Sequence, residues 1–130
     1  MDPCSLLSKG LVETTVSGAV GTVRELTPDD FLSPPPSGFV ACAYSTDTRY
    51  GQVLVSVQPS GRDDYEAQYV ERDPTNTREV PNLGEDARFS VCGSLSVFSN
   101  GRVLQLGIQF ADCKALPRLV SLAQVAIRRL

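Results

Sequence analysis

The sequence predicts an α+β fold: an antiparallel sheet with N-terminal, middle and C-terminal helices packed mainly on one face. Three observations predict it. Apolar and polar residues alternate with the period of a strand in 52–58 and in 94–106. Asn100-Gly101 lies inside the second run, as a two-residue hairpin turn does. Residues 116–130 repeat apolar side chains at helical spacing. A hairpin with one apolar face must bury that face, and helices can cover it.

The N-terminal segment predicts a short helix. Asp2 can cap free backbone N–H groups, and Pro3 suits the first helical position. Ser8 offers a second cap, and Gly18 ends the apolar stripe. That stripe consists of Leu7, Leu11, Val12 and Val16. We therefore expect Cys4 in the first turn of a short helix.

Three strands are predicted around a long loop. Residues 20–26 predict the first strand, 39–44 the second and 52–58 the third. Between the first two, residues 27–38 (TPDDFLSPPPSG) form a proline-rich loop, because three consecutive prolines favour extended polyproline geometry. The alternating apolar residues of the third strand are Val53, Val55 and Val57.

A second helix is predicted in the middle of the chain. Asp63 and Glu66 have the spacing of a capping box, in which two side chains satisfy free N–H groups at a helix start. Tyr65 and Tyr69 lie four residues apart and so share one helix face. We interpret the two tyrosines as half-buried packing residues rather than as a stacking platform for a ligand.

The hairpin around Asn100-Gly101 is the strongest local signal. Its register pairs Val97 with Leu104, Leu95 with Leu106 and Val91 with Phe110 on one face. The opposite face carries Ser94, Ser96, Gln105 and Gln109. We expect the hairpin to be central in the sheet, with Leu95, Val97, Leu104 and Leu106 buried.

The C-terminal segment 116–130 predicts an amphipathic helix that faces the core. Pro117 lies in its first turn, where a missing N–H is tolerated. A helix bound to a membrane surface would carry more Lys and Arg on its polar face. The apolar positions are Leu116, Leu119, Val120, Ala123, Ala126, Ile127 and Leu130.

Length and charge limit the class of protein. At 130 residues the chain is predicted to be one domain, 1–130, large enough to bury a core. With a net charge of −3 and no basic cluster beyond Arg128-Arg129, nucleic acid is not an expected partner. No apolar run approaches the roughly 18 residues of a membrane span. Met1 leads directly into Asp2, so we expect that a signal peptide has been removed ahead of this segment.

The residue types argue against catalysis and metal binding. Histidine is absent, which removes the commonest general base and the commonest neutral metal ligand. No close cysteine pair such as C-x-x-C suggests a zinc site. We expect no metal, no organic cofactor and no enzymatic activity. The acidic pairs, interpreted as caps or solvated loop charges, are Asp29-Asp30, Asp63-Asp64 and Glu85-Asp86, the last of which follows Gly84 at a predicted strand entry.

Four cysteines, Cys4, Cys42, Cys92 and Cys113, are spread along the chain. We interpret them as two disulfides, which implies an oxidising compartment; four reduced structural cysteines are the alternative. Of three possible pairings we favour Cys4–Cys42 with Cys92–Cys113, which closes two moderate loops worth about 3–4 kcal/mol each. The hairpin register places Cys92 opposite Gln109, so the chain must fold back beyond the hairpin for Cys113 to reach it.

Several segments carry a resemblance to a known family: DPCSLL near the start, ACAY around Cys42, VPNLGEDA before the hairpin and RLVSLAQVAIRRL at the end. Over most of its length the chain resembles small actinobacterial envelope lipoproteins, a family without an established activity. The resemblance implies that Cys4 is bonded to Cys42. It also implies a domain carried behind an acylated cysteine and a linker. Cys4 is not that lipid-bearing cysteine, because Asp2-Pro3 differs from the small residues that precede one.

These observations lead us to expect a non-enzymatic extracytoplasmic domain, membrane-anchored or secreted, that binds an envelope protein, lipid or glycan. Contact with the membrane is expected only through a lipid anchor outside this chain. The alternative is a small-ligand or lipid carrier or sensor with a pocket between the sheet and the helices. A sizeable apolar cavity would favour the carrier.

Overall fold

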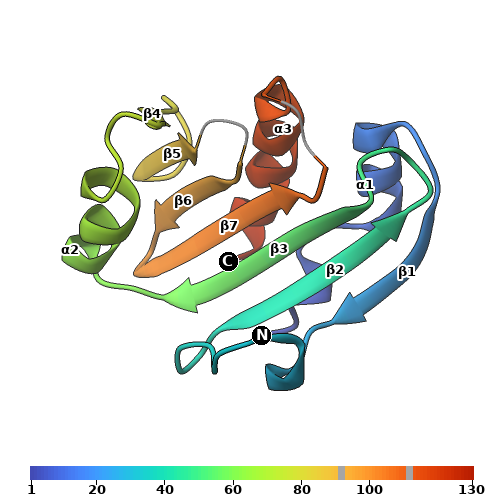
Figure 1. Cartoon of the computed structure of the whole chain (residues 1–130), viewed down its shortest axis with the longest axis horizontal. Helices are drawn as coiled ribbons and strands as arrows, with labels where there is room; N and C mark the ends of the chain where they lie inside the picture. The colour runs from blue at the N-terminus through green and yellow to red at the C-terminus, as the bar shows by residue number, and fades with distance from the viewer. Residues whose placement is uncertain (91–92, 111–112) are drawn as a thin grey trace.

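The computed structural model describes residues 1–90, 93–110 and 113–130. Within these residues seven strands form one sheet in the order β1-β2-β3-β7-β6-β5-β4, with every neighbouring pair antiparallel. Helices α1 and α3 lie side by side behind the sheet, and α2 lies at the end near β4 and β5 (Figure 1). The predicted α+β class and the N-terminal, middle and C-terminal helix positions are confirmed.

The helices and strands follow one another along the chain in the predicted order of helix, strands, helix, strands and helix. The strands are β1 (Val20–Glu25), β2 (Val40–Thr46), β3 (Gln52–Pro59), β4 (Thr77–Glu79), β5 (Asp86–Ser90), β6 (Leu95–Ser99) and β7 (Arg102–Ile108). The helices are α1 (Lys9–Val16), α2 (Arg62–Tyr65) and α3 (Leu116–Ala126), with 3-10 turns η1 (Pro3–Ser5), η2 (Pro28–Asp30) and η4 (Ile127–Arg129). A π-helical segment, η3 (Glu66–Glu71), continues α2, and we name residues 62–71 the middle helix.

The N-terminal segment divides into two helical elements, each with its predicted cap. The Asp2 side chain accepts a hydrogen bond from the N–H of Cys4 at 2.9 Å, which starts turn η1. The Ser8 hydroxyl accepts one from the N–H of Leu11 at 3.1 Å, which starts α1. Helix α1 ends where Ser17 takes the left-handed conformation, with φ 58°. Cys4 therefore lies in a 3-10 turn that precedes α1, because two caps start two separate elements.

The main core fills the space between the sheet and helices α1 and α3. The predicted hairpin pairs Val97–Leu104 and Leu95–Leu106 are both formed, and all four side chains are fully buried. β7 is the fourth of the seven described strands, so the hairpin is central, as predicted. Val91, predicted opposite Phe110, lies outside the described residues. The predicted apolar residues of β3 are also buried: Val53, Val55 and Val57.

Helix α3 covers this core with nearly the predicted stripe. Leu119, Ala123 and Ala126 are fully buried. Leu122, which the predicted stripe omits, is also fully buried, whereas Val120, which it includes, is only partly buried. The difference arises because the buried stripe of the helix is wide enough to include positions on both sides of the predicted line.

The middle helix packs against the opposite face of the sheet. Tyr65 stacks on Phe98 with ring centroids 5.2 Å apart, and Val103 completes this small second core. Side chains alternate between faces along a strand, so Phe98 and Val103 point away from the main core. The predicted capping box at Asp63 is wrong. The helix starts at Arg62, because the Gly61 carbonyl directly after β3 already accepts a hydrogen bond from the Tyr65 N–H.

A disulfide joins Cys4 to Cys42, as predicted, with a Cα–Cα distance of 5.2 Å. Cys42 is fully buried in β2, so the bond holds turn η1 against the sheet on the face of the main core. Tyr44, two residues further along β2, donates its hydroxyl proton toward the carbonyls of Leu7 at 2.8 Å and Cys4 at 3.2 Å. The N-terminal segment is thus tied to β2 by a covalent bond and by hydrogen bonding.

The disulfide indicates folding in an oxidising compartment, as in extracytoplasmic proteins. None of the helices in the described parts of the chain is long and apolar enough to cross a membrane. The second predicted pairing, Cys92–Cys113, includes Cys92, which lies outside the described residues. That pairing stays a prediction.

Truncation of Leu106 to alanine should lower the free energy of unfolding by about 2–5 kcal/mol, because it leaves a cavity in the main core. Urea denaturation measures the loss. Leu32→Ala is the matched control, since Leu32 is fully exposed, and it should change stability by no more than about 0.5 kcal/mol. Equal losses for the two variants would show that the sheet face assigned to the main core is wrong.

Replacement of both Cys4 and Cys42 by alanine should lower the free energy of unfolding by about 2–5 kcal/mol. The bond closes a loop between residues 38 positions apart, and its removal frees the unfolded chain. Urea denaturation of the purified double variant measures the loss, and peptide mapping of the parent protein without reductant detects the linked peptide. Free thiols at both positions in protein purified without reductant would contradict the assignment.

Candidate functional site

One face of the sheet is left open between the middle helix and the proline-rich loop. Its central row runs across five strands through directly paired residues: Ala41, Ser56, Gln105, Ser96 and Arg88. All five are small or polar, whereas the residues next to them along each strand point into the main core. We name this side of the sheet the open face. Its small side chains leave room for hollows above it.

Two hollows border the middle helix on the open face. The first, which we name the polar cleft, has a volume of about 390 Å³. Gln68, Tyr69 and Arg72 line its helix side, and Arg88, Ser94 and Gln105 are among the residues that line its sheet side. A second hollow of about 430 Å³ lies toward Pro36 and Pro59 and shares Gln68 and Arg72 with the polar cleft.

A third hollow lies toward the proline-rich loop. This apolar hollow has a volume of about 250 Å³ and is lined mainly by Leu26, Phe31, Phe39, Leu54 and Gly107. Phe31 and Phe39 meet edge to face with ring centroids 5.4 Å apart, which joins the loop to the start of β2. The apolar hollow shares Ser94 and Gln105 with the polar cleft. The three hollows therefore adjoin one another along the open face, and we name them together the groove.

The polar cleft is rich in groups that both donate and accept hydrogen bonds. Gln105 Nε2 donates to Ser94 Oγ at 3.0 Å, which fixes two of its residues. Arg72 makes no hydrogen bond or ion pair with any described residue, so its guanidinium is available to a ligand. The neighbouring Asp73 also lines the cleft and binds the Asn76 amide at 3.2 Å. Each of these groups can form a hydrogen bond to a polar ligand without depriving a buried group of its hydrogen-bond partner.

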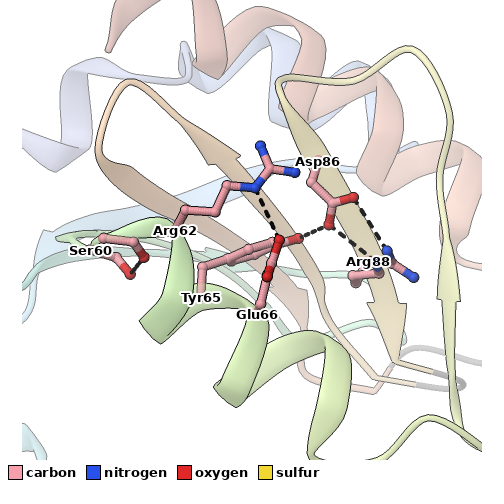
Figure 2. A network of polar contacts seen from close by, with 7 residues as sticks. Ser60, Arg62, Tyr65, Glu66, Asp86 and Arg88 are labelled. Atoms are coloured by element: carbon pink, nitrogen blue, oxygen red, sulfur yellow. Dashed lines mark hydrogen bonds and ion pairs between the residues drawn. The ribbon is translucent and has the colours of Figure 1, made fainter.

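Arg88 is held in the cleft by a network that comes from the middle helix and β5 (Figure 2). The Tyr65 hydroxyl donates to Asp86 Oδ2 at 2.8 Å. The same carboxylate accepts from Arg88 through Nε at 3.1 Å and Nη2 at 3.4 Å. The third guanidinium nitrogen of Arg88, Nη1, makes no hydrogen bond to a described residue. Asp86 thus orients the guanidinium and leaves one nitrogen for a ligand.

The pKa values in this network reflect burial and the Asp86 charge. Burial raises the pKa of the Tyr65 phenol far above its ordinary value, and the hydrogen bond to Asp86 raises it further. The hydrogen bond to Asp86 also raises the pKa of Arg88. Tyr65 therefore stays protonated as a donor, and Arg88 stays charged, across the physiological pH range. The network positions Arg88 rather than exchanging protons.

The acidic pairs singled out in the sequence are not brought together. Asp30 caps turn η2 by accepting from the N–H of Thr27 at 2.7 Å and pairs with Arg24 at 3.1 Å; the hydrogen bond with Thr27 lowers the pKa of Asp30. Glu85 accepts from the N–H of Asn100 at 2.8 Å and so supports the hairpin turn. The pair Asp63-Asp64 is exposed on the middle helix. Asp86 alone among these residues belongs to the network beside the cleft.

Comparison with models of protein families finds no match to this chain. No curated protein matches it, and no solved structure does. Among the described residues, no group of three or more His, Cys, Asp or Glu side chains is placed to hold a metal ion. The functional proposal therefore rests on the groove and its chemistry.

The sequence alone does not predict the polar cleft. Arg72 and Arg88 come from separate elements and carry no shared motif. One sequence pattern did indicate the sheet side of the cleft. The alternation along the hairpin predicted that Ser94, Ser96 and Gln105 share one face, and all three line the cleft. A row of small polar residues on a central strand pair is the feature that indicates an uncovered sheet face.

Replacement of Tyr65 by phenylalanine should lower the free energy of unfolding at neutral pH by about 1.5–3 kcal/mol, because a hydrogen bond to a charged group is lost. Tyr69→Phe is the matched control, since the Tyr69 hydroxyl only accepts a long contact of 3.4 Å from Gln58, and it should cost at most about 1 kcal/mol. Urea denaturation measures both.

The same variant has an alkaline readout. The folded protein holds the Tyr65 proton more tightly than the unfolded chain, whose tyrosine pKa is about 10. The resulting stability is present below pH 10 and is lost as the pH rises above it. Tyr65→Phe should therefore lose less stability than the parent between about pH 10 and 11. An equal or steeper loss in the variant would contradict the raised pKa of the buried Tyr65 phenol.

Proposed function

We propose that the protein is a non-enzymatic extracytoplasmic domain, tethered to the cell membrane, that binds an envelope component in the polar cleft. The observation that carries the proposal is the cleft itself, about 390 Å³ on the open face. It holds the guanidinium of Arg72, which has no hydrogen-bond or ion-pair partner among the described residues, and the guanidinium of Arg88, which Asp86 orients. The volume lies within the range of about 300–1,000 Å³ typical of ligand pockets, and the lining is polar rather than apolar.

The location outside the cytoplasm is supported by two features. The Cys4–Cys42 bond fits an oxidising compartment. The segments around both cysteines resemble actinobacterial envelope lipoproteins, in which such a domain follows a lipid anchor and a linker. Absence of histidine from the chain supports a binding role over acid–base catalysis.

The second candidate is a carrier of a lipid or small ligand, and the apolar hollow favours it. That hollow measures about 250 Å³, below the range of about 300–1,000 Å³ typical of ligand pockets. It lies between the sheet and the proline-rich loop, not between the sheet and the helices. The larger polar cleft, which does lie under the middle helix, makes binding through polar contacts the better-supported function.

Reversal of charge at Arg72 should abolish binding to an envelope fraction. Arg72→Glu removes donors from the cleft, and it breaks no hydrogen bond or ion pair among the described residues. Sedimentation of the purified domain with actinobacterial cell walls and, separately, with membranes measures the bound share. We expect at least a tenfold loss of affinity, because one good contact to a charged group is worth more than about 1.4 kcal/mol.

Arg128→Glu is the matched control, because Arg128 is an exposed arginine of turn η4 and does not line the groove. It carries the same change in net charge and should bind as the parent does. An equal loss of binding in both variants would show that the effect arises from net charge and not from the position of Arg72 in the cleft. No binding of the parent to either fraction would overturn the proposed function.

A further inference from the structure

We propose that the groove binds a single-chain glycolipid, with its sugar head in the polar cleft and its alkyl chain in the apolar hollow. This inference rests on the proposed function and names the ligand class of the same groove. It is carried by two adjacent hollows of opposite character on the open face, which share the lining residues Ser94 and Gln105.

The polar cleft suits an uncharged head rich in hydroxyl groups. A sugar hydroxyl both donates and accepts, and the serine hydroxyls and glutamine amides of the cleft do the same. The charges around the cleft sum to nearly zero, because Asp86 pairs with Arg88 and Asp73 lines the cleft together with Arg72. A cleft that is nearly neutral and densely polar favours a neutral sugar over a strongly anionic head.

The apolar hollow exists because one position on the central strand β7 has no side chain. Gly107 pairs with Leu54 across β3 and β7, on the open face. A Cβ atom at this glycine would meet nothing closer than the Cβ atom of Ser94 at 3.8 Å, so space remains above the strand. Leu54 is 38% exposed there, although it lies on an inner strand of the sheet. An alkyl chain would cover it and remove apolar surface from water.

Gln105 marks the border between the two environments. Its amide lines both hollows and already donates to Ser94, so the polar floor is fixed where the apolar walls begin. A ligand with a polar head directly joined to an apolar chain matches this boundary. A free sugar would leave the apolar surface of the hollow in contact with water. An alkyl chain with a poor hydrogen-bonding head would leave polar groups of the cleft without hydrogen bonds to the ligand.

Titration with octyl β-glucoside, followed by amide NMR shifts below the micelle-forming concentration, tests the inference. Methyl β-glucoside supplies the head without the chain, and octyl tetraethylene glycol ether supplies the chain with a head that donates only one hydroxyl. We expect octyl β-glucoside to bind at least tenfold more tightly than either, with shifts at both Arg72 and Leu54. Equal affinity for octyl β-glucoside and either partial ligand would overturn the inference.

A filling variant separates the two halves of the groove. Gly107→Val puts a β-branched side chain into the apolar hollow on a strand that tolerates it. It should weaken octyl β-glucoside at least tenfold and leave methyl β-glucoside unchanged. Gly21→Val on β1 is the matched control, since Gly21 faces open space with only the Ser45 carbonyl at 4.0 Å, and it should change neither affinity.

Failure of this inference is distinguishable from failure of the proposed function. If Gly107→Val leaves octyl β-glucoside binding unchanged while its fold is intact by amide NMR, the chain does not occupy the apolar hollow. If no glucoside binds but Arg72→Glu still abolishes binding to the envelope fraction, the glycolipid is wrong and the cleft remains a binding site. If Gly107→Val does not fold, the affinities of the parent protein for the three probes still test the inference.

Discussion

The two faces of the strands β3, β7 and β6 are the constraint on which the rest of this structure depends. Side chains alternate along each strand, so the same hairpin that buries Leu104 and Leu106 must present Gln105 and Gly107 on the other side. A slip of one residue would exchange the two sets and place leucines in solvent. The same strand register therefore determines both the main core and the open face, and the groove follows from the residues that the core leaves on the other side.

The elements that border the groove are attached by different interactions. The middle helix is fixed by Tyr65, which stacks on Phe98 and donates to Asp86. The proline-rich loop is fixed by the capped turn at Asp30 and by the contact of Phe31 with Phe39. The middle helix connects the inner strand β3 to the edge strand β4, whereas the proline-rich loop connects β1 to β2 at the other edge of the sheet. The gap between them is what makes a site possible.

The opposite face is stabilised by the N-terminal segment and helix α3. The Cys4–Cys42 bond holds turn η1 on β2, and Arg129 at the other end of the chain donates to the carbonyl of Ser5 at 2.9 Å. Both chain ends therefore meet on the covered side of the sheet. The disulfide that fastens this side of the core fits a protein that folds in an oxidising compartment, where such a bond persists.

The sequence by itself determined the features that depend on local chemistry. The register around Asn100-Gly101, the caps at Asp2 and Ser8, and the burial of the predicted hairpin residues were all predictable, because turn chemistry, capping and alternation act over a few residues. The Cys4–Cys42 bond was predictable as one of three pairings. The row of Ser94, Ser96 and Gln105 was visible as a polar face without any indication of what covers it.

Only the tertiary structure decided the rest. Three features depend on where separate elements cross the sheet. They are the face on which the middle helix packs, the start of that helix at Arg62, and the presence of Arg72, Arg88 and Gln105 in one cleft. Periodicity tells which residues of an element share a face, but it does not tell which other element lies against that face. The groove is therefore a tertiary feature, since its walls come from segments that have no local reason to meet.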